Sequence, residues 1–421
     1  MVLIYIFFFS IWLRSVYVKY GFNISAFLIS LYLIGSILCG AIMLFYPDYI
    51  KHYDRITFTS VSAHIVILFL MMYPIIRYGN SIKVENIHVG KQSLSIFSWF
   101  IAICTISCII VSCVDIGQIL MYGDFAKARN AYMLGELDSE GPVKRWGYIG
   151  YFIAMGNLVS FIATFLFFYW KFYLKQNSIL TYLLFLGSFT IAIENLTIAG
   201  RDGIIRCILF YVANYALFKK YIIFRQHKGI LAIFCSIGII GGIFFSAISN
   251  DRFKNSDRGV FFSLIRYGGE QFYLFSYNYQ RFFSDGMNSM EVMFPIIYGD
   301  QYTAHDLNKL ARADFYLNTF STIAGSFVQR IGVINTLILV FFGFITLSLI
   351  FWRKYKFSPN IGLAKIISFL IFYEILMLGY FYYMHYTKML QVYLIFCVFL
   401  AYVISCTQTS RTAHTPKSFM K

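Results

Sequence analysis

The sequence predicts an all-α integral membrane protein, because apolar runs of about 20 residues recur along it and charged residues are scarce. Hydrophobic residues make up 59% of the 421-residue chain and charged residues 13%. Ordinary soluble domains carry roughly 25% charged residues. Since we find no internal repeat and no low-complexity linker, we expect a single polytopic transmembrane domain over 1–421.

The apolar runs divide the chain into about eleven expected membrane spans. The first run has no basic start and no small-residue cleavage site, so we interpret it as a retained span rather than a cleaved signal peptide. The expected ranges are 1–13, 24–46, 57–76, 94–121, 149–170, 178–200, 203–222, 229–249, 331–352, 361–380 and 389–406.

The distribution of basic residues predicts the orientation of these spans. Alternate connections, together with the C-terminal tail, hold eighteen Lys or Arg residues and one acid, Glu85. Such connections lie on the cytoplasmic side of a membrane. The net charge of +16 is therefore mostly this signal, and we exclude nucleic acid as a partner. The N-terminus is expected outside and the C-terminus in the cytoplasm.

Two larger connections are expected on the outer side, at 122–148 and 250–330. The second holds eight basic and eight acidic residues and many Tyr and Phe, which argues against simple disorder. Loops of more than about 15 residues are usually functional or disordered. Within it, aromatic residues interleave with Arg266, Glu270 and Arg281 over 261–283. This pattern predicts an amphipathic helix on the outer leaflet, or aromatic side chains that stack on sugars.

Three carboxylates, Asp115, Glu194 and Glu374, fall inside expected spans. Each lies about six residues from the expected outward end of its span, or roughly 9 Å below the surface. Acids within a membrane are costly and by default mark a polar cavity. The alternatives are an outward-open cavity with an acidic floor and a set of structural hydrogen bonds between helices.

Arginines at the outer ends of spans are candidates for binding an anion. Arg201 lies at the start of an apolar helix, where a guanidinium is well placed to bind phosphate, or to reach lipid headgroups. Asp202 and Arg206 are four residues apart and are expected to pair. In the smaller outer connection, Arg129 either binds an anionic substrate or pairs with a neighbouring acid.

Several chemistries are excluded by missing motifs. We find no P-loop, no Gly-x-Ser-x-Gly and no metal-site spacing around the expected outward histidines, among them His305. We therefore expect no metal and no cofactor. The lone His64 in an apolar run argues against a membrane O-acyltransferase.

Together with the layout, the segments "IAGRDGII" (198–205) and "IRYGGEQF" (265–272) and the stretch 317–344 resemble segments of one known family, the Wzy-type O-antigen and capsule repeat-unit polymerases. "IAGRDGII" (198–205) resembles the family's turn before an apolar helix, which would give Arg201 a role. "IRYGGEQF" (265–272) resembles the start of the helical part of the large loop, with Arg266 and Tyr267. The stretch 317–344 resembles the family's Asn-x-Thr-Phe segment, with Asn318.

The sequence departs from the family pattern in two places. Glu270 stands where a Pro usually follows the Gly pair, and "QRIG" replaces an acidic-aromatic-Gly segment.

The resemblance implies a GT-C-like fold and a reaction at the outer leaflet of a bacterial inner membrane. A growing oligosaccharide would pass from undecaprenyl pyrophosphate to a hydroxyl of the next lipid-linked repeat unit, for O-antigen (lipopolysaccharide) or capsule. Membrane lipids, a flippase and a chain-length regulator would be partners. Arg201, Arg129, Arg266, Tyr267, Arg281 and Asn318 would bind substrate, and Glu194, Asp115, Glu270 and His305 are candidate bases.

Two other functions stay open. An O-antigen ligase shares this layout and differs in its acceptor. A flippase or transporter of lipid-linked sugar would carry charges along a path through many spans, whereas the acids here are expected on one side.

Overall fold

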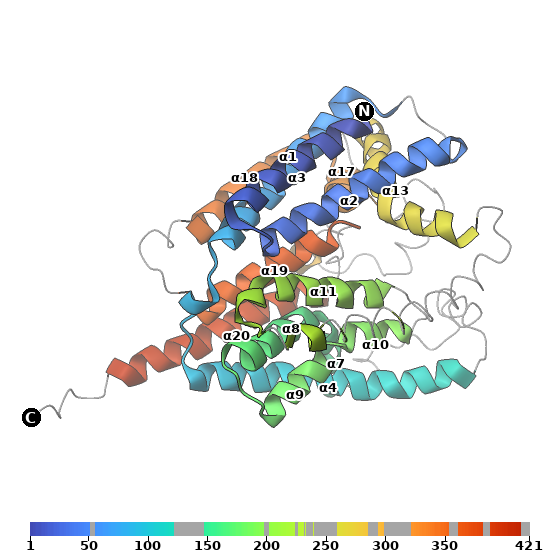
Figure 1. The fold of residues 1–421 in the computed structure, drawn as a ribbon. Coiled ribbons are helices and arrows are strands. Elements are labelled where there is room, and N and C mark those ends of the chain that lie inside the picture. The colour runs from blue at the N-terminus through green and yellow to red at the C-terminus, as the bar shows by residue number, and fades with distance from the viewer. Residues whose placement is uncertain are drawn as a thin grey trace, which may run out of the picture. The chain divides into compact units, whose positions relative to one another are not determined.

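The computed structural model describes residues 1–50, 55–121, 147–197, 202–223, 226–230, 232, 239, 259–284, 294–298, 321–352, 361–381 and 388–413. Regular structure within these residues is helical, apart from one isolated bridge between Ile87 and Ile361 (Figure 1). The all-α prediction is therefore confirmed for the described part of the chain.

Three long apolar helices open the chain: α1 (Val2–Tyr20), α2 (Ile24–Phe45) and α3 (Phe58–Ser81). The Asn23 side chain starts α2, since its oxygen accepts the Ala26 N–H at 2.8 Å. A short 3₁₀ turn, η1 (Pro47–Tyr49), follows α2.

The middle of the chain forms η3 (Val84–Asn86), α4 (Lys91–Met121), α7 (Tyr148–Leu158), α8 (Ser160–Phe168), η4 (Tyr169–Tyr173), α9 (Ile179–Gly187), α10 (Thr190–Leu196), α11 (Asp202–Phe218) and η5 (Lys219–Tyr221). The remainder forms α13 (Gly259–Arg281), α15 (Pro295–Tyr298), α17 (Thr322–Ile331), α18 (Val333–Trp352), α19 (Leu363–Leu378) and α20 (Lys388–Ala413).

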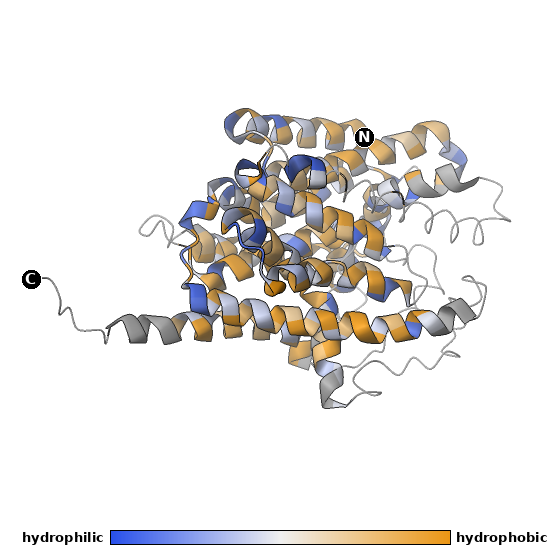
Figure 2. Cartoon of the chain, turned by 60° about the horizontal axis from the view of Figure 1, so that its bottom comes forward, coloured by the Kyte–Doolittle hydropathy of each residue, from blue (hydrophilic) through white to orange (hydrophobic). Residues whose placement is uncertain are grey.

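Five described helices, α1, α2, α3, α4 and α18, are long and apolar enough to cross a membrane. Two bent pairs raise the number to seven if each pair is one span: the α7–α8 segment bends by 62° and α9–α10 by 42°. Apolar residues cover most of the length of the helices, and hydrophilic residues gather toward their ends (Figure 2). A membrane-embedded protein is confirmed. The count of eleven spans stays a prediction, and 229–249 lies almost entirely outside the described residues.

The chain divides into two compact units. Unit 1 comprises Met1–Ser81, Ile243–Lys354 and Phe372–Gln391, and unit 2 comprises Ile82–Gly242, Tyr355–Ile371 and Val392–Lys421. Unit 1 contains α1, α2, α3, α13, α17 and α18, and unit 2 contains α4, α7 to α11 and most of α20. The expected single domain over 1–421 stays a prediction.

In unit 1, connections that were expected on the outer side contact one another. Tyr49 in the 47–57 connection bonds Glu270 of the 250–330 segment. The Thr322 N–H of the same segment donates to Phe381 O, after α19, at 3.1 Å.

In unit 2, connections that were expected in the cytoplasm also meet. The Tyr221 hydroxyl donates to Glu85 at 2.9 Å, and the Ile361 N–H donates to Asn86 O at 2.7 Å. The predicted alternation of sides is thus consistent within each unit.

The helix predicted at 261–283 is present as α13, but its expected place on the membrane surface is wrong. Its apolar face is enclosed by protein, since Phe272 and Phe275 are fully buried. α13 packs along α2 and also touches α3 and α17. The reason is an interleaved pattern of small and polar residues, which suits contact with other helices better than contact with lipid.

Candidate functional site

Two consecutive glycines bring α13 into backbone contact with α2. A Cβ atom on Gly269 would lie 2.5 Å from the backbone of both Leu38 and Cys39. The missing side chain therefore permits the approach of the two helices. The Tyr380 hydroxyl adds a hydrogen bond to Gly268 O. Together these contacts fix the place of the residues that follow on α13.

Glu270 follows the glycine pair and is 1% exposed. Its Oε2 accepts hydrogen bonds from Arg266 Nε at 2.8 Å and from the Tyr49 hydroxyl at 3.3 Å. The Arg266 guanidinium carbon lies 5.5 Å from the Tyr49 ring centroid and 5.9 Å from that of Tyr267. Glu270 Oε1 has no hydrogen-bond partner among the described residues. Glu270 thus ties the 47–57 connection to α13.

The environment of Glu270 determines what its carboxyl can do. Burial raises the pKa of Glu270, and the positive charge of Arg266 opposes this rise without cancelling it. The carboxyl is enclosed by protein and accepts hydrogen bonds from Arg266 and Tyr49. It can therefore orient these two side chains.

Arg55 is held at the start of α3 by a local capping arrangement. Thr57 and Ser60 each donate a backbone N–H to the hydroxyl of the other at 3.2 Å. The Gln280 side-chain amide donates to Arg55 O at 3.2 Å. The last turn of α13 is therefore tied to the residues before α3.

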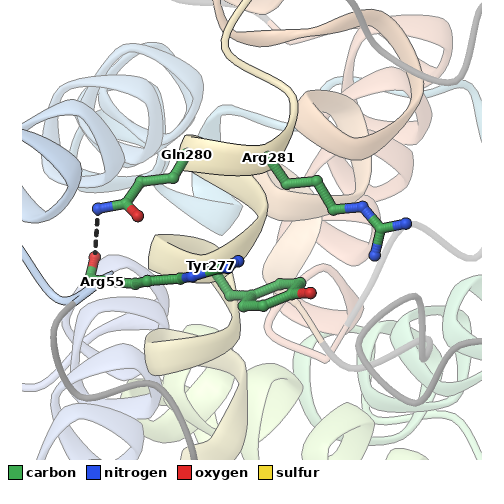
Figure 3. A pocket seen from close by; sticks show the side chains of 4 residues that line it. All are labelled: Arg55, Tyr277, Gln280 and Arg281. Carbon is green, nitrogen blue, oxygen red and sulfur yellow. Dashed lines mark hydrogen bonds between the residues drawn. The ribbon is translucent and has the colours of Figure 1, made fainter.

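At this junction, four residues line an open pocket of about 510 Å³: Arg55, Tyr277, Gln280 and Arg281 (Figure 3). The Arg55 guanidinium carbon lies 4.5 Å from the Tyr277 ring centroid, a cation–π distance. Gln280 and Arg281 extend from α13 in opposite directions. The volume lies within the range of roughly 300–1,000 Å³ that small-molecule sites occupy.

The chemistry of the lining favours an anion that also bears hydroxyl groups. None of the four side chains is acidic, so the lining carries the charge of two guanidinium groups. Guanidinium groups bind phosphate or carboxylate through parallel N–H bonds. The Gln280 amide and Tyr277 phenol supply donors and acceptors for hydroxyl groups.

Four of the predicted site residues share α13: Arg266, Tyr267, Glu270 and Arg281. Arg281 lines the pocket, whereas Arg266 and Glu270 form the ion pair nearer the glycines. The Tyr267 carbonyl accepts a hydrogen bond from the Gln271 side chain at 2.5 Å. His305, Arg201, Arg129 and Asn318 lie outside the described residues.

Glu194 and Asp115 belong to unit 2. The Asn157 amide nitrogen donates to Glu194 Oε2 at 3.0 Å, and Asn157 Oδ1 is buried without a partner among the described residues. Asp115 is half-buried on α4. The predicted pair of Asp202 and Arg206 is confirmed, with a distance of 2.5 Å between the charged groups.

The expected common depth of the three intramembrane acids stays a prediction. Asp115 lies six residues before the last described residue of α4, Glu194 two residues before the end of α10, and Glu374 four residues before the end of α19. α10 ends at Leu196, whereas its span was expected to end at residue 200.

Sequence reasoning missed Tyr49, Arg55, Tyr277 and Gln280. Tyr49 and Arg55 lie in a short connection between spans, and their partners are more than 200 positions away in the sequence. One sequence signal could have found Tyr49 and Arg55: an expected outer connection contains both a tyrosine and an arginine. No group of three or more His, Cys, Asp or Glu suited to a metal ion occurs among the described residues.

Comparisons with protein-family models, with curated proteins and with solved structures find no match to this chain.

Proposed function

We propose that this protein is a membrane glycosyltransferase that polymerises oligosaccharide repeat units carried on undecaprenyl pyrophosphate. The observation that carries the proposal is the pocket of Arg55, Tyr277, Gln280 and Arg281, with two guanidinium groups and no acid among the described residues that line it. A diphosphate-linked sugar has the two features that this lining suits, a doubly charged group and hydroxyls.

The location of the pocket supports the same substrate. Arg55 comes from the 47–57 connection and Arg281 from the 250–330 segment, which are both expected on the outer face. The lipid-linked repeat unit is presented to the enzyme on that face. In this proposal the chain has eleven spans in a GT-C-like arrangement in the inner membrane, with its C-terminus in the cytoplasm.

The reaction exchanges one glycosidic bond for another. The bond between the anomeric carbon of the growing chain and its phosphate oxygen breaks, and a hydroxyl of the incoming unit bonds to that carbon. The hydroxyl proton passes to a base, and undecaprenyl pyrophosphate leaves. Arg55 and Arg281 stabilise the charge that develops on the leaving diphosphate.

Glu270 takes a positioning role in this proposal, because its enclosed carboxyl already bonds Arg266 and Tyr49. The sequence predicted Glu194 and Asp115 as further candidate bases, and both belong to unit 2. Of these, Glu194 is held by Asn157 in a defined geometry.

Deletion of the gene, followed by electrophoresis of the surface polysaccharide, tests the proposal. Loss of a polymerase leaves a single repeat unit on its acceptor, whereas loss of a ligase leaves none. A normal ladder would contradict both functions. Complementation with the wild-type chain restores the ladder, and with Arg55→Ala/Arg281→Ala it does not.

A further inference from the structure

His64, which is isolated in the sequence, joins four helices of unit 1. It lies on α3 and is fully buried. Its Nδ1 is 2.8 Å from the Tyr5 hydroxyl of α1, and its Nε2 is 2.9 Å from Thr322 Oγ1 of α17. Its ring stacks on Phe275 of α13 with centroids 3.9 Å apart and an interplanar angle of 3°.

Both ring nitrogens of His64 are hydrogen-bonded. A neutral imidazole has one donor and one acceptor nitrogen. In one tautomer His64 donates to Thr322 Oγ1 and accepts from the Tyr5 hydroxyl, and in the other tautomer both directions are reversed. Thr322 Oγ1 also accepts the Gly325 N–H at 3.4 Å. Every polar atom of the ring is thereby used.

Thr322 is held in a backbone conformation that a β-branched residue rarely adopts. Its φ is +56°, in the left-handed region. The Thr322 N–H donates to Phe381 O at 3.1 Å and the Ile323 N–H donates to Gly379 O at 2.6 Å. Strained residues persist where their surroundings over-determine them, and they cluster at functional sites.

The face of α3 that carries His64 also binds α13 next to the pocket. Ser60 is one helical turn before His64, and its hydroxyl donates to Ser276 Oγ at 2.9 Å. Ser60 therefore contacts α13 at Ser276, and His64 contacts it at Phe275. These two residues immediately precede Tyr277, which lines the pocket.

We propose that His64 is a positioning residue for the pocket: it bonds Tyr5 and Thr322 and stacks on Phe275, and so sets α13 against α3 and places Arg281 relative to Arg55. The effect on catalysis rests on the proposed function, whereas the effect on the position of α13 does not.

Amide hydrogen exchange of residues 277–281, measured on the purified full-length protein in detergent, tests this. His64→Phe keeps a stacking ring and removes both hydrogen bonds. Thr322→Val removes the hydroxyl with little change of shape, and Thr322→Ser keeps it. We expect about fivefold faster exchange in Thr322→Val, the size of one lost hydrogen bond. We expect a larger increase in His64→Phe, which loses two, and wild-type exchange in Thr322→Ser.

Tyr373→Phe is the matched control, because it removes a buried hydrogen bond to Ile24 O in the same unit. Ile24 is the first residue of α2, whereas α13 meets the α2 backbone at Leu38 and Cys39. It should leave exchange at 277–281 unchanged. Unchanged exchange in both His64→Phe and Thr322→Val would overturn the positioning role. Thr322→Val supplies the answer if His64→Phe does not fold.

The length of the surface polysaccharide in cells is the second measurement. Shorter chains in Thr322→Val, at equal protein level, are expected. Faster exchange with unchanged chain length would confirm the positioning of α13 and contradict the proposed function of the pocket, so the two failures are distinguishable.

Discussion

Arg55 lies with its guanidinium carbon 4.5 Å from the ring centroid of Tyr277, although 222 positions separate the two residues. The contact places a cation from the connection before α3 on an aromatic ring of α13. The other two residues that line the pocket, Gln280 and Arg281, lie on the next turn of α13.

Replacing either pocket arginine should weaken binding of an anionic substrate. A hydrogen bond to a charged group contributes about 1.5–3 kcal/mol, so Arg55→Ala or Arg281→Ala is expected to weaken binding roughly 10- to 100-fold. Electrophoresis of the polysaccharide should show short chains. Lys19→Ala is the control, because Lys19 also lies over an aromatic ring, that of Tyr20, and lines no part of the pocket. Equal ladders in the arginine and Lys19 variants would contradict the assignment.

Glu194→Gln tests the candidate base in unit 2. The amide keeps an oxygen that accepts the Asn157 hydrogen bond, so protein level should stay unchanged. If Glu194 is the base, chain elongation should stop at one unit, because an amide does not accept a proton at neutral pH. A full-length ladder in this variant would remove Glu194 from the mechanism and leave Asp115 as the described candidate.

Removing the cation beside Glu270 should destabilise unit 1. Arg266→Met leaves a buried carboxylate without its counter-ion, at a cost of about 3 kcal/mol. The double variant Arg266→Met/Glu270→Leu removes both charges and should recover most of that loss. Thermal unfolding of the purified protein measures both. A double variant as unstable as Arg266→Met would show that packing, and not charge, explains the loss.

Glu270 should also make stability depend on pH. Burial raises its pKa above the ordinary value of 4.5, so the folded state binds its proton more tightly than the unfolded state does. Stability from this group is fully present below the unfolded pKa and falls as pH rises through the window up to the folded pKa. The melting temperature of wild type relative to Glu270→Gln should therefore fall as pH rises above 4.5. A constant difference would contradict the raised pKa.

The two neighbouring glycines of α13 should differ in their tolerance of a methyl group. A Cβ on Gly269 meets backbone atoms of Leu38 and Cys39 at 2.5 Å, so α13 and α2 must separate. The nearest atoms to a Cβ on Gly268 all belong to the Leu38 side chain, and that side chain can rotate away. Gly269→Ala should cost about 1–3 kcal/mol and Gly268→Ala clearly less. The difference in melting temperature between the two variants measures this, and equal losses would argue against backbone contact.

The sequence predicted the helices well, because apolar runs and caps are local signals. It placed Arg266, Glu270 and Arg281 on one helix for the same reason. It did not predict the partners of that helix, since Arg55 and Tyr49 reach α13 only through the packing of α2 and α3. His64 was isolated in sequence because its partners, Tyr5 and Thr322, are 59 and 258 positions away. The sequence did not predict that α10 ends at Leu196, because the bend between α9 and α10 leaves no mark in hydropathy.

The backbone contact between Gly269 and α2 has a consequence for biogenesis. More than 200 residues separate the end of α2 from the start of α13. At about 5–20 residues per second, the ribosome needs roughly 10–40 s to make them. During that interval α2 is already synthesised, while the narrow face around Leu38 and Cys39 has no α13 to cover it. Assembly of the pocket is therefore a late step in the maturation of the protein.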